Sequence, residues 1–200
     1  MTFVEFAAKW FGRIAHTYIG QRRKYSGVWY FRHTEAVHDT VMRFGGSRYQ
    51  GAAAYLHDYK EDVVTYLKAH GKWIALWMFE TVYKILFPLV VRELVIELTD
   101  VYTSENYPVK QNPLWNRKWR KAQEAHRISK ISDAAKEIKL ADLYDNTSSI
   151  VNEDADFAIT YLKEKHHVMK FLHGEHVNRN LYHVVHAQMQ KNIDLLKVNV

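Results

Sequence analysis

The sequence predicts an all-α protein that folds as a compact helical bundle. Only three Pro and eight Gly occur in 200 residues, so breaks between helices are few. Apolar residues recur three and four positions apart along most of the chain, which is the period of an amphipathic helix rather than of a strand. Together, these two observations predict helices joined by short turns, with no sheet.

In the N-terminal half, the chain alternates between helical patterns and short breaks. Gly45-Gly46 and Gly71 fall between periodic segments and mark the expected turns. The small residues from Ala52 to Ala54 suit a tightly packed helix. The expected helices in this half span about residues 3–24, 33–44, 49–59, 61–69, 73–86 and 89–101.

In the C-terminal half, the starts of helices are marked more clearly. Asn112-Pro113 and Ser132-Asp133 both suit a helix N-terminus, because Asn and Ser cap free backbone N–H groups and Pro fits the first turn. Gly174 marks the last turn. The expected helices in this half span about residues 113–128, 131–146, 151–171 and 179–196.

The length and composition suit one soluble domain over residues 1–200. Apolar residues make up 48% and charged residues 25% of the chain, as in ordinary globular proteins. Cys is absent, which excludes disulfides and thiolate ligands, so any metal must be bound by imidazole and carboxylate groups. We expect residues of about 10–165 to carry the function, with C-terminal helices over 166–200.

The charge pattern bears on partners and location. The formal net charge of +6 favours an anionic partner, either a nucleotide or a nucleic acid. Charged residues interrupt the N-terminal helix, so it lacks the core of a signal peptide. The most apolar stretch, residues 73–91, contains Glu80, Lys84 and Pro88, which favours buried helices over a membrane span. We therefore expect a cytoplasmic protein with no membrane partner.

The dipeptide His57-Asp58 is the strongest chemical signal. It follows the small apolar run, and Glu61 and Asp62 arrive one turn later. On an α-helix these four groups would share one broad face. Burying this much charge is costly unless a cation or hydrogen bonds compensate it. The pattern predicts a metal ion beside acid–base groups, as in a metal-dependent hydrolase.

Two distant segments offer matching groups. A basic cluster that includes Arg23 and Lys24 precedes a turn and then His33, at an expected helix start. Much later, Asp142 lies among apolar neighbours, and Asn146 follows four residues on, on the same helix face. An acid among apolar residues favours a ligand over a solvated carboxylate.

The order His…His-Asp…Asp resembles the HD phosphohydrolase superfamily. The surrounding residues are similar to one branch, the SpoT/RelA-type (p)ppGpp hydrolase domain and its small stand-alone relatives. Four blocks carry this resemblance: Ala15-His16 with Gln21-Arg22-Arg23-Lys24; Tyr30-Phe31-Arg32-His33; Ala53-Ala54-Tyr55-Leu56-His57-Asp58 with Glu61-Asp62; and Ile138-Lys139-Leu140-Ala141-Asp142 with Asn146.

The resemblance implies a fold of the HD type and a role for each matched residue. One divalent ion, usually Mn²⁺, with Zn²⁺ or Fe²⁺ as alternatives, would be bound by four side chains. These implied metal ligands are His33, His57, Asp58 and Asp142. Glu61 and Asp62 match the catalytic acidic pair. The implied substrate-binding residues are Arg23 or Lys24, together with Lys139 and Asn146.

The resemblance also implies a reaction, the removal of the 3′-pyrophosphate of (p)ppGpp to give GDP or GTP. Thr34 and Val63 depart from the family pattern, which leaves open another nucleotide such as a dNTP, a nucleoside monophosphate or NADPH. A third alternative is a non-catalytic nucleotide or RNA binder. The intact pair Glu61 and Asp62 disfavours it, since a binder needs no groups to activate water.

Three further features have simpler interpretations. His38-Asp39 repeats the dipeptide, but helical rotation places both residues toward solvent. The C-terminal histidines are expected at the surface. The strip from Trp115 to Lys121 mixes aromatic rings with cations, which fits the rim of a nucleotide pocket better than a nucleic-acid site. We expect a guanine nucleotide, rather than a nucleic acid, as the partner.

Overall fold

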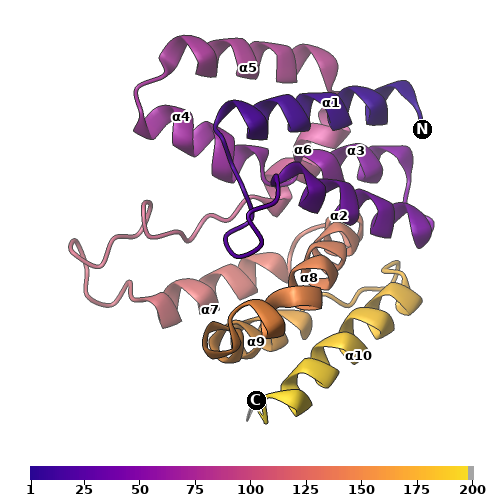
Figure 1. The fold of residues 1–200 in the computed structure, drawn as a ribbon, viewed down its shortest axis with the longest axis vertical. Helices are drawn as coiled ribbons and strands as arrows, with labels where there is room; N and C mark the ends of the chain where they lie inside the picture. Colours follow the sequence, from indigo (N-terminus) through magenta and orange to yellow (C-terminus); the bar gives the residue numbers. More distant parts are fainter. Residues whose placement is uncertain (198–200) are drawn as a thin grey trace.

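The computed structural model describes residues 1–197, and its regular structure is helical (Figure 1). Within these residues, β-structure is limited to one isolated bridge between Arg22 and Trp29. The prediction of an all-α fold is confirmed. The helices are α1 Phe3–Tyr18, α2 Phe31–Arg43, α3 Arg48–Leu56, the π-helix η1 Tyr59–Val64, α4 Thr65–Ala69, α5 Trp73–Leu86, α6 Leu89–Leu98, α7 Arg117–Ile128, α8 Asp133–Glu153, α9 Ala155–Met169 and α10 Arg179–Leu195.

Helix α3 lies at the centre of the N-terminal half and contacts α1, α2, α6 and α8. Its residues Ala52, Ala53 and Ala54 are fully buried, and their small side chains allow neighbouring helices to come close. Helix α1 comes close to α3 at Gly12, where a Cβ atom would lie 2.7 Å from the carbonyl oxygen of Tyr55. Helix α8 joins this half to α9 and α10, which lie at the other end of the molecule (Figure 1).

The first helix is six residues shorter than we expected. Gly20 follows the C-cap with a φ of +69°, a left-handed conformation that favours Gly and ends a helix. Residues 19–30 then form a loop that the Arg22–Trp29 bridge closes, with the Arg22 guanidinium 3.9 Å from the centre of the Trp29 ring. This loop presents the basic cluster that the sequence placed on a helix.

The other boundaries differ where side-chain caps decide them. Helix α7 begins at Arg117 rather than at residue 113, because the Asn116 side chain accepts a hydrogen bond from the N–H group of Trp119. Helix α8 continues to Glu153 rather than ending near residue 146, and the next cap is Asp154, which accepts from the N–H of Phe157. Among residues 1–197, no helix combines the length and apolar character that crossing a bilayer requires.

Candidate functional site

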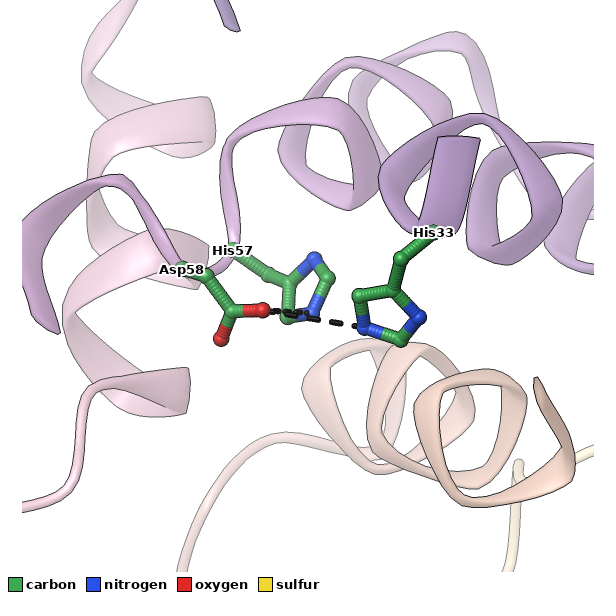
Figure 2. A group of neighbouring side chains, drawn as sticks. All are labelled: His33, His57 and Asp58. Atoms are coloured by element: carbon green, nitrogen blue, oxygen red, sulfur yellow. Dashed lines mark ion pairs between the residues drawn. The ribbon is translucent and has the colours of Figure 1, made fainter. Parts of the chain in front are cut away.

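Four of the predicted site residues meet between α2, α3 and α8. His33 lies in the first turn of α2, and His57 and Asp58 lie where α3 ends and η1 begins. Figure 2 shows these three side chains directed toward one another. The Oδ2 atom of Asp58 is 2.8 Å from Nε2 of His57 and 3.7 Å from Nε2 of His33.

Asp142 of α8 completes the group. Its Oδ1 atom lies 3.2 Å from Nε2 of His33 and 3.8 Å from Nε2 of His57. All four side chains are largely buried, with His33 and His57 only 2% exposed. The structure therefore brings together two imidazole nitrogens and two carboxylate oxygens from three separated segments of the chain.

The two imidazole rings are oriented by hydrogen bonds through their other nitrogen atoms. Nδ1–H of His33 donates to Oδ2 of Asp145 at 2.6 Å, and Nδ1–H of His57 donates to the carbonyl oxygen of Ala54 at 2.8 Å. Each Nε2 atom consequently faces the carboxylates with its lone pair, as in histidines that ligate metals.

The residues present fit a divalent cation. Both Nε2 atoms are buried, and neither has a hydrogen-bond partner within residues 1–197. Buried polar atoms without partners are rare and call for an explanation, of which a bound ion is one. Donor atoms of His33, His57 and Asp58 all lie within 4.8 Å of one another, so this group can hold a metal ion. Imidazole and carboxylate suit Mn, Fe or Zn.

The electrostatics of the group also favour a cation. Burial opposes a charge on His33, but the adjacent carboxylates of Asp142 and Asp145 outweigh burial and raise its pKa to about 9. The carboxyl group of Asp142 has a pKa well below its usual range, since Lys139 and the two histidines outweigh burial. The acids thus draw positive charge into the site, which a divalent ion would supply.

Two residues that support this group were not predicted from the sequence. The Tyr30 hydroxyl donates to Oδ2 of Asp58 at 2.5 Å, and Asp145 accepts from Nη1 of Arg23 at 2.7 Å as well as from His33. Asp145 lies three residues after Asp142, on the same face of α8, so its position was a usable signal. Tyr30 lies within one of the resembling blocks.

Glu61 and Asp62 lie close to the group but not on the α-helix that we predicted. Helix α3 ends at Leu56, and the chain continues as a π-helix, a form that is common at functional sites. The wider turn separates the two acids. Glu61 accepts a hydrogen bond from the N–H of Asp100, whereas Asp62 accepts one from the amide of Gln21 at 2.7 Å.

Both acids have pKa values near neutrality. Burial and the nearby carboxylate of Asp100 raise the pKa of Glu61 to about 8, and burial and Asp58 raise that of Asp62 to about 7. They line a polar cavity of about 880 Å³ together with Lys60 and Lys68. Groups with such pKa values can accept or release a proton near neutral pH.

The predicted substrate-binding residues lie beside the cluster. Arg23 points inward to Asp145, with its Nη2 atom 3.4 Å from Oδ1 of Asn146, whereas Lys24 lies at the surface beside Tyr25. A cavity of about 210 Å³ opens here, lined by Arg23, Lys24, Tyr25, Tyr30, Asn146, Ile150, Glu153, Phe157 and Tyr161. Lys139 faces the cluster directly, with Nζ 3.0 Å from Oδ2 of Asp142.

The prediction for His38 was wrong. Its side chain is only 11% exposed and stacks on the ring of Tyr55, with ring centres 4.1 Å apart, because Gly51 leaves room beside it. Asp39 does face solvent, as predicted. Most of the C-terminal histidines are exposed, and within residues 1–197 they form no metal-binding group.

The aromatic and basic strip does not line the small cavity next to the cluster. Trp115 and Trp119 pack instead against Tyr102 and Tyr107, with Trp and Tyr ring centres 5.2 to 5.8 Å apart. These rings hold together the long connection between α6 and α7. These contacts therefore do not support the predicted role of the strip at the rim of a nucleotide pocket.

The described residues form an all-α fold that brings two histidines and two aspartates together between α2, α3 and α8. The chain is similar to a solved structure described as a metazoan ortholog of SpoT that hydrolyzes ppGpp and plays a role in starvation responses. The two share 21% sequence identity with a TM-score of 0.69, over 98% of this chain and 96% of that chain. No protein-family model and no curated protein matches the chain.

Proposed function

We propose that the protein is a metal-dependent nucleotide phosphohydrolase. The observation that carries the proposal is the pair of buried Nε2 atoms of His33 and His57, which have no hydrogen-bond partner among residues 1–197 and face the carboxylates of Asp58 and Asp142. These four side chains are the proposed metal ligands. A bound divalent ion supplies Lewis acidity, which lowers the pKa of a water molecule and offsets negative charge on a phosphate group.

The acidic pair would provide the proton chemistry. Asp62, placed by its hydrogen bond from Gln21, and Glu61, placed by the N–H of Asp100, are the candidates to accept a proton from the attacking water. Their near-neutral pKa values support this role. Because the two side chains bind different partners, we expect their substitutions to have unequal effects.

The base of the nucleotide would lie in the cavity of about 210 Å³ next to the cluster, and its phosphates would extend toward the cluster and the acidic pair. Its aromatic rings, Tyr25, Phe157 and Tyr161, suit a base, and Arg23 and Lys24 suit phosphates. Asn146 lies between the cluster and Arg23, since its side-chain N–H group donates to Asp142 and its side-chain oxygen faces Arg23. Lys139 would offset charge on the metal side.

We infer that the substrate is (p)ppGpp, cleaved to GDP or GTP and pyrophosphate. The support is the likeness in fold to a ppGpp hydrolase over nearly the whole chain, together with the ordered residue blocks. The Mn²⁺-loaded protein is expected to release pyrophosphate from ppGpp. His57→Ala and Asp142→Ala should each reduce kcat by at least about a thousandfold, because each removes a ligand.

His183→Ala is the matched control, since that histidine is exposed on α10. Full activity in His57→Ala or Asp142→Ala would contradict the proposed site. A panel of a dNTP, a nucleoside monophosphate and NADPH tests the rival substrates in the same assay. If one of these nucleotides is hydrolysed and ppGpp is not, the proposed phosphohydrolase activity holds but its substrate is that nucleotide.

A further inference from the structure

The outer faces of α1 and α5 form an exposed apolar surface that the proposed reaction does not use. Figure 1 shows the two helices side by side at one end of the molecule. The exposed residues of α1 recur every three or four positions and are mostly apolar: Phe3, Phe6, Trp10, Arg13, Ile14, Thr17 and Tyr18. One side of α1 packs in the core, and the other presents rings to solvent.

Helix α5 repeats this arrangement. Trp73, Ile74 and Trp77 are 62%, 79% and 69% exposed, and Met78, Val82 and Ile85 follow on the same side. Between α5 and α1 runs an open groove of about 810 Å³, lined almost entirely by apolar side chains. Contiguous apolar patches of this kind mark sites of interaction with proteins or membranes.

The charges on this surface have one sign. Within the fully described helices α1 and α5, the exposed charged side chains are Arg13 and Lys84, both cationic. The two acids of these helices are not exposed. Glu5 is buried and hydrogen-bonded to Thr2, and Glu80 is half-buried and forms an ion pair with Lys60 at 2.7 Å. The surface therefore offers aromatic rings and positive charge, with no exposed acid of these helices.

We propose that this surface, formed by α1 and α5, docks on an anionic lipid bilayer. Trp and Tyr rings favour the level of the lipid headgroups, aliphatic side chains such as Ile74 and Ile85 favour the acyl boundary, and Lys and Arg are attracted to anionic headgroups. A second copy of the chain fits less well. A two-fold contact would bring Arg13 and Lys84 of one copy toward Arg13 and Lys84 of the other, and these like charges repel.

This mode of binding differs from spanning a membrane. The expectation of no membrane partner rested on the lack of a long uncharged segment, and helices that lie in the interface need no such segment. Asp142 and the nucleotide cavity are carried largely by α8 and its neighbours, away from α1 and α5 in Figure 1. The nucleotide cavity would stay open to solvent while the outer faces of α1 and α5 bind lipid. Leu76 and Glu80 of α5, which line the cavity of the acidic pair, are half-buried and lie outside those faces.

Co-sedimentation of the full chain with vesicles tests the proposal. We expect binding to phosphatidylcholine vesicles that contain phosphatidylglycerol, much weaker binding to pure phosphatidylcholine, and a blue shift of Trp fluorescence in the bound state. Ile74→Ser combined with Trp77→Ser should abolish binding. Lys84→Glu should weaken it at least about fivefold, from the contribution of one cation near a charged surface.

Each variant has a matched control elsewhere on the surface. Leu114→Ser removes an equally exposed apolar side chain, and Lys163→Glu makes the same charge change on α9. Both controls should bind like the parent, and circular dichroism should show all variants folded. A folded parent that fails to bind anionic vesicles would overturn the proposal. So would a dimer in solution that Ile74→Ser and Trp77→Ser dissociate, which would assign the surface to a second copy.

Discussion

Asp145 determines how His33 presents its Nε2 atom. The carboxylate accepts Nδ1–H of His33 at 2.6 Å, which fixes both the ring orientation and the tautomer. It is held in turn by Arg23 at 2.7 Å, so the loop of residues 19–30 supports the cluster. Partners of this kind tune the affinity of a metal site without touching the ion.

Removing this partner should weaken metal binding without unfolding the protein. We expect Asp145→Ala to lower Mn²⁺ affinity about 10- to 100-fold, because the imidazole loses its orienting acceptor. Asp145→Asn keeps an acceptor and should lose less. Isothermal titration measures the affinities.

Asp39→Ala is the control, since that carboxylate is 71% exposed on the same helix as His33. Thermal unfolding of the two variants establishes that both are folded. An affinity in Asp145→Ala equal to that of the parent would show that Asp145 does not orient a ligand.

At this scale, the sequence predicted the four clustered side chains, because their residue types and order are specific. It did not predict the supports from Tyr30 and Asp145, although Asp145 shares a face of α8 with Asp142. The prediction for His38 was wrong because its burial depends on how α2 packs on α3. The period of a helix indicates its main buried face, but the space beside Gly51 that admits the His38 ring is a property of packing.

Among the helices, the π-helix η1 has the largest consequence for the site. A continuous α-helix through residues 56–64 would have placed His57, Asp58, Glu61 and Asp62 on one face. The wider turn instead sends Glu61 toward Asp100 and Asp62 toward Gln21. Hydrophobic periodicity carries no signal for a π-helix of six residues, so the sequence could not predict it.

Helix ends were predictable where the capping residue is local. Ser132 caps α8 and accepts from the N–H of Ala135, as the sequence indicated. The end of α1 was missed because Gln21, Arg22, Arg23 and Lys24 are good helix formers, whereas the left-handed backbone at Gly20 shows that the helix has already stopped.

Asp133 links α8 to the turn before α10 and gives a pH-dependent prediction. The N–H of His176 and the ammonium group of Lys136 lower the pKa of Asp133 below its usual 3.8. A pKa lowered in the folded state stabilises the fold above the unfolded pKa, and this stability is lost as pH falls through the folded value. Asp133 should therefore contribute fully at pH 7.

Asp133→Asn tests this contribution by urea unfolding at several pH values. We expect the substitution to lower the free energy of unfolding by about 1 kcal/mol at pH 7. The difference from the parent should shrink below pH 4 and close once Asp133 is protonated. Glu175→Gln, on an exposed neighbour, should have little effect at any of these pH values. A difference that stayed constant from pH 7 to pH 3 would contradict the assignment.

Across the whole molecule, the four clustered side chains come from three segments, and His33 and Asp142 are more than a hundred residues apart in the sequence. Helix α8 carries Asp142 against α2, and α3 carries His57 into the same space. The sequence predicted this meeting through its resemblance to the HD family, whereas periodicity alone gave only a bundle. The likeness to a solved SpoT ortholog supports the arrangement at the level of the fold.

The proposed function depends on one divalent ion bound by His33, His57, Asp58 and Asp142. The most direct test is anomalous diffraction from crystals grown with Mn²⁺. We predict a single strong peak within coordination distance of Nε2 of both histidines and of a carboxylate oxygen of each aspartate, at about 2.0–2.3 Å. No peak at this position under saturating Mn²⁺, or a peak bound by other residues, would contradict this proposal.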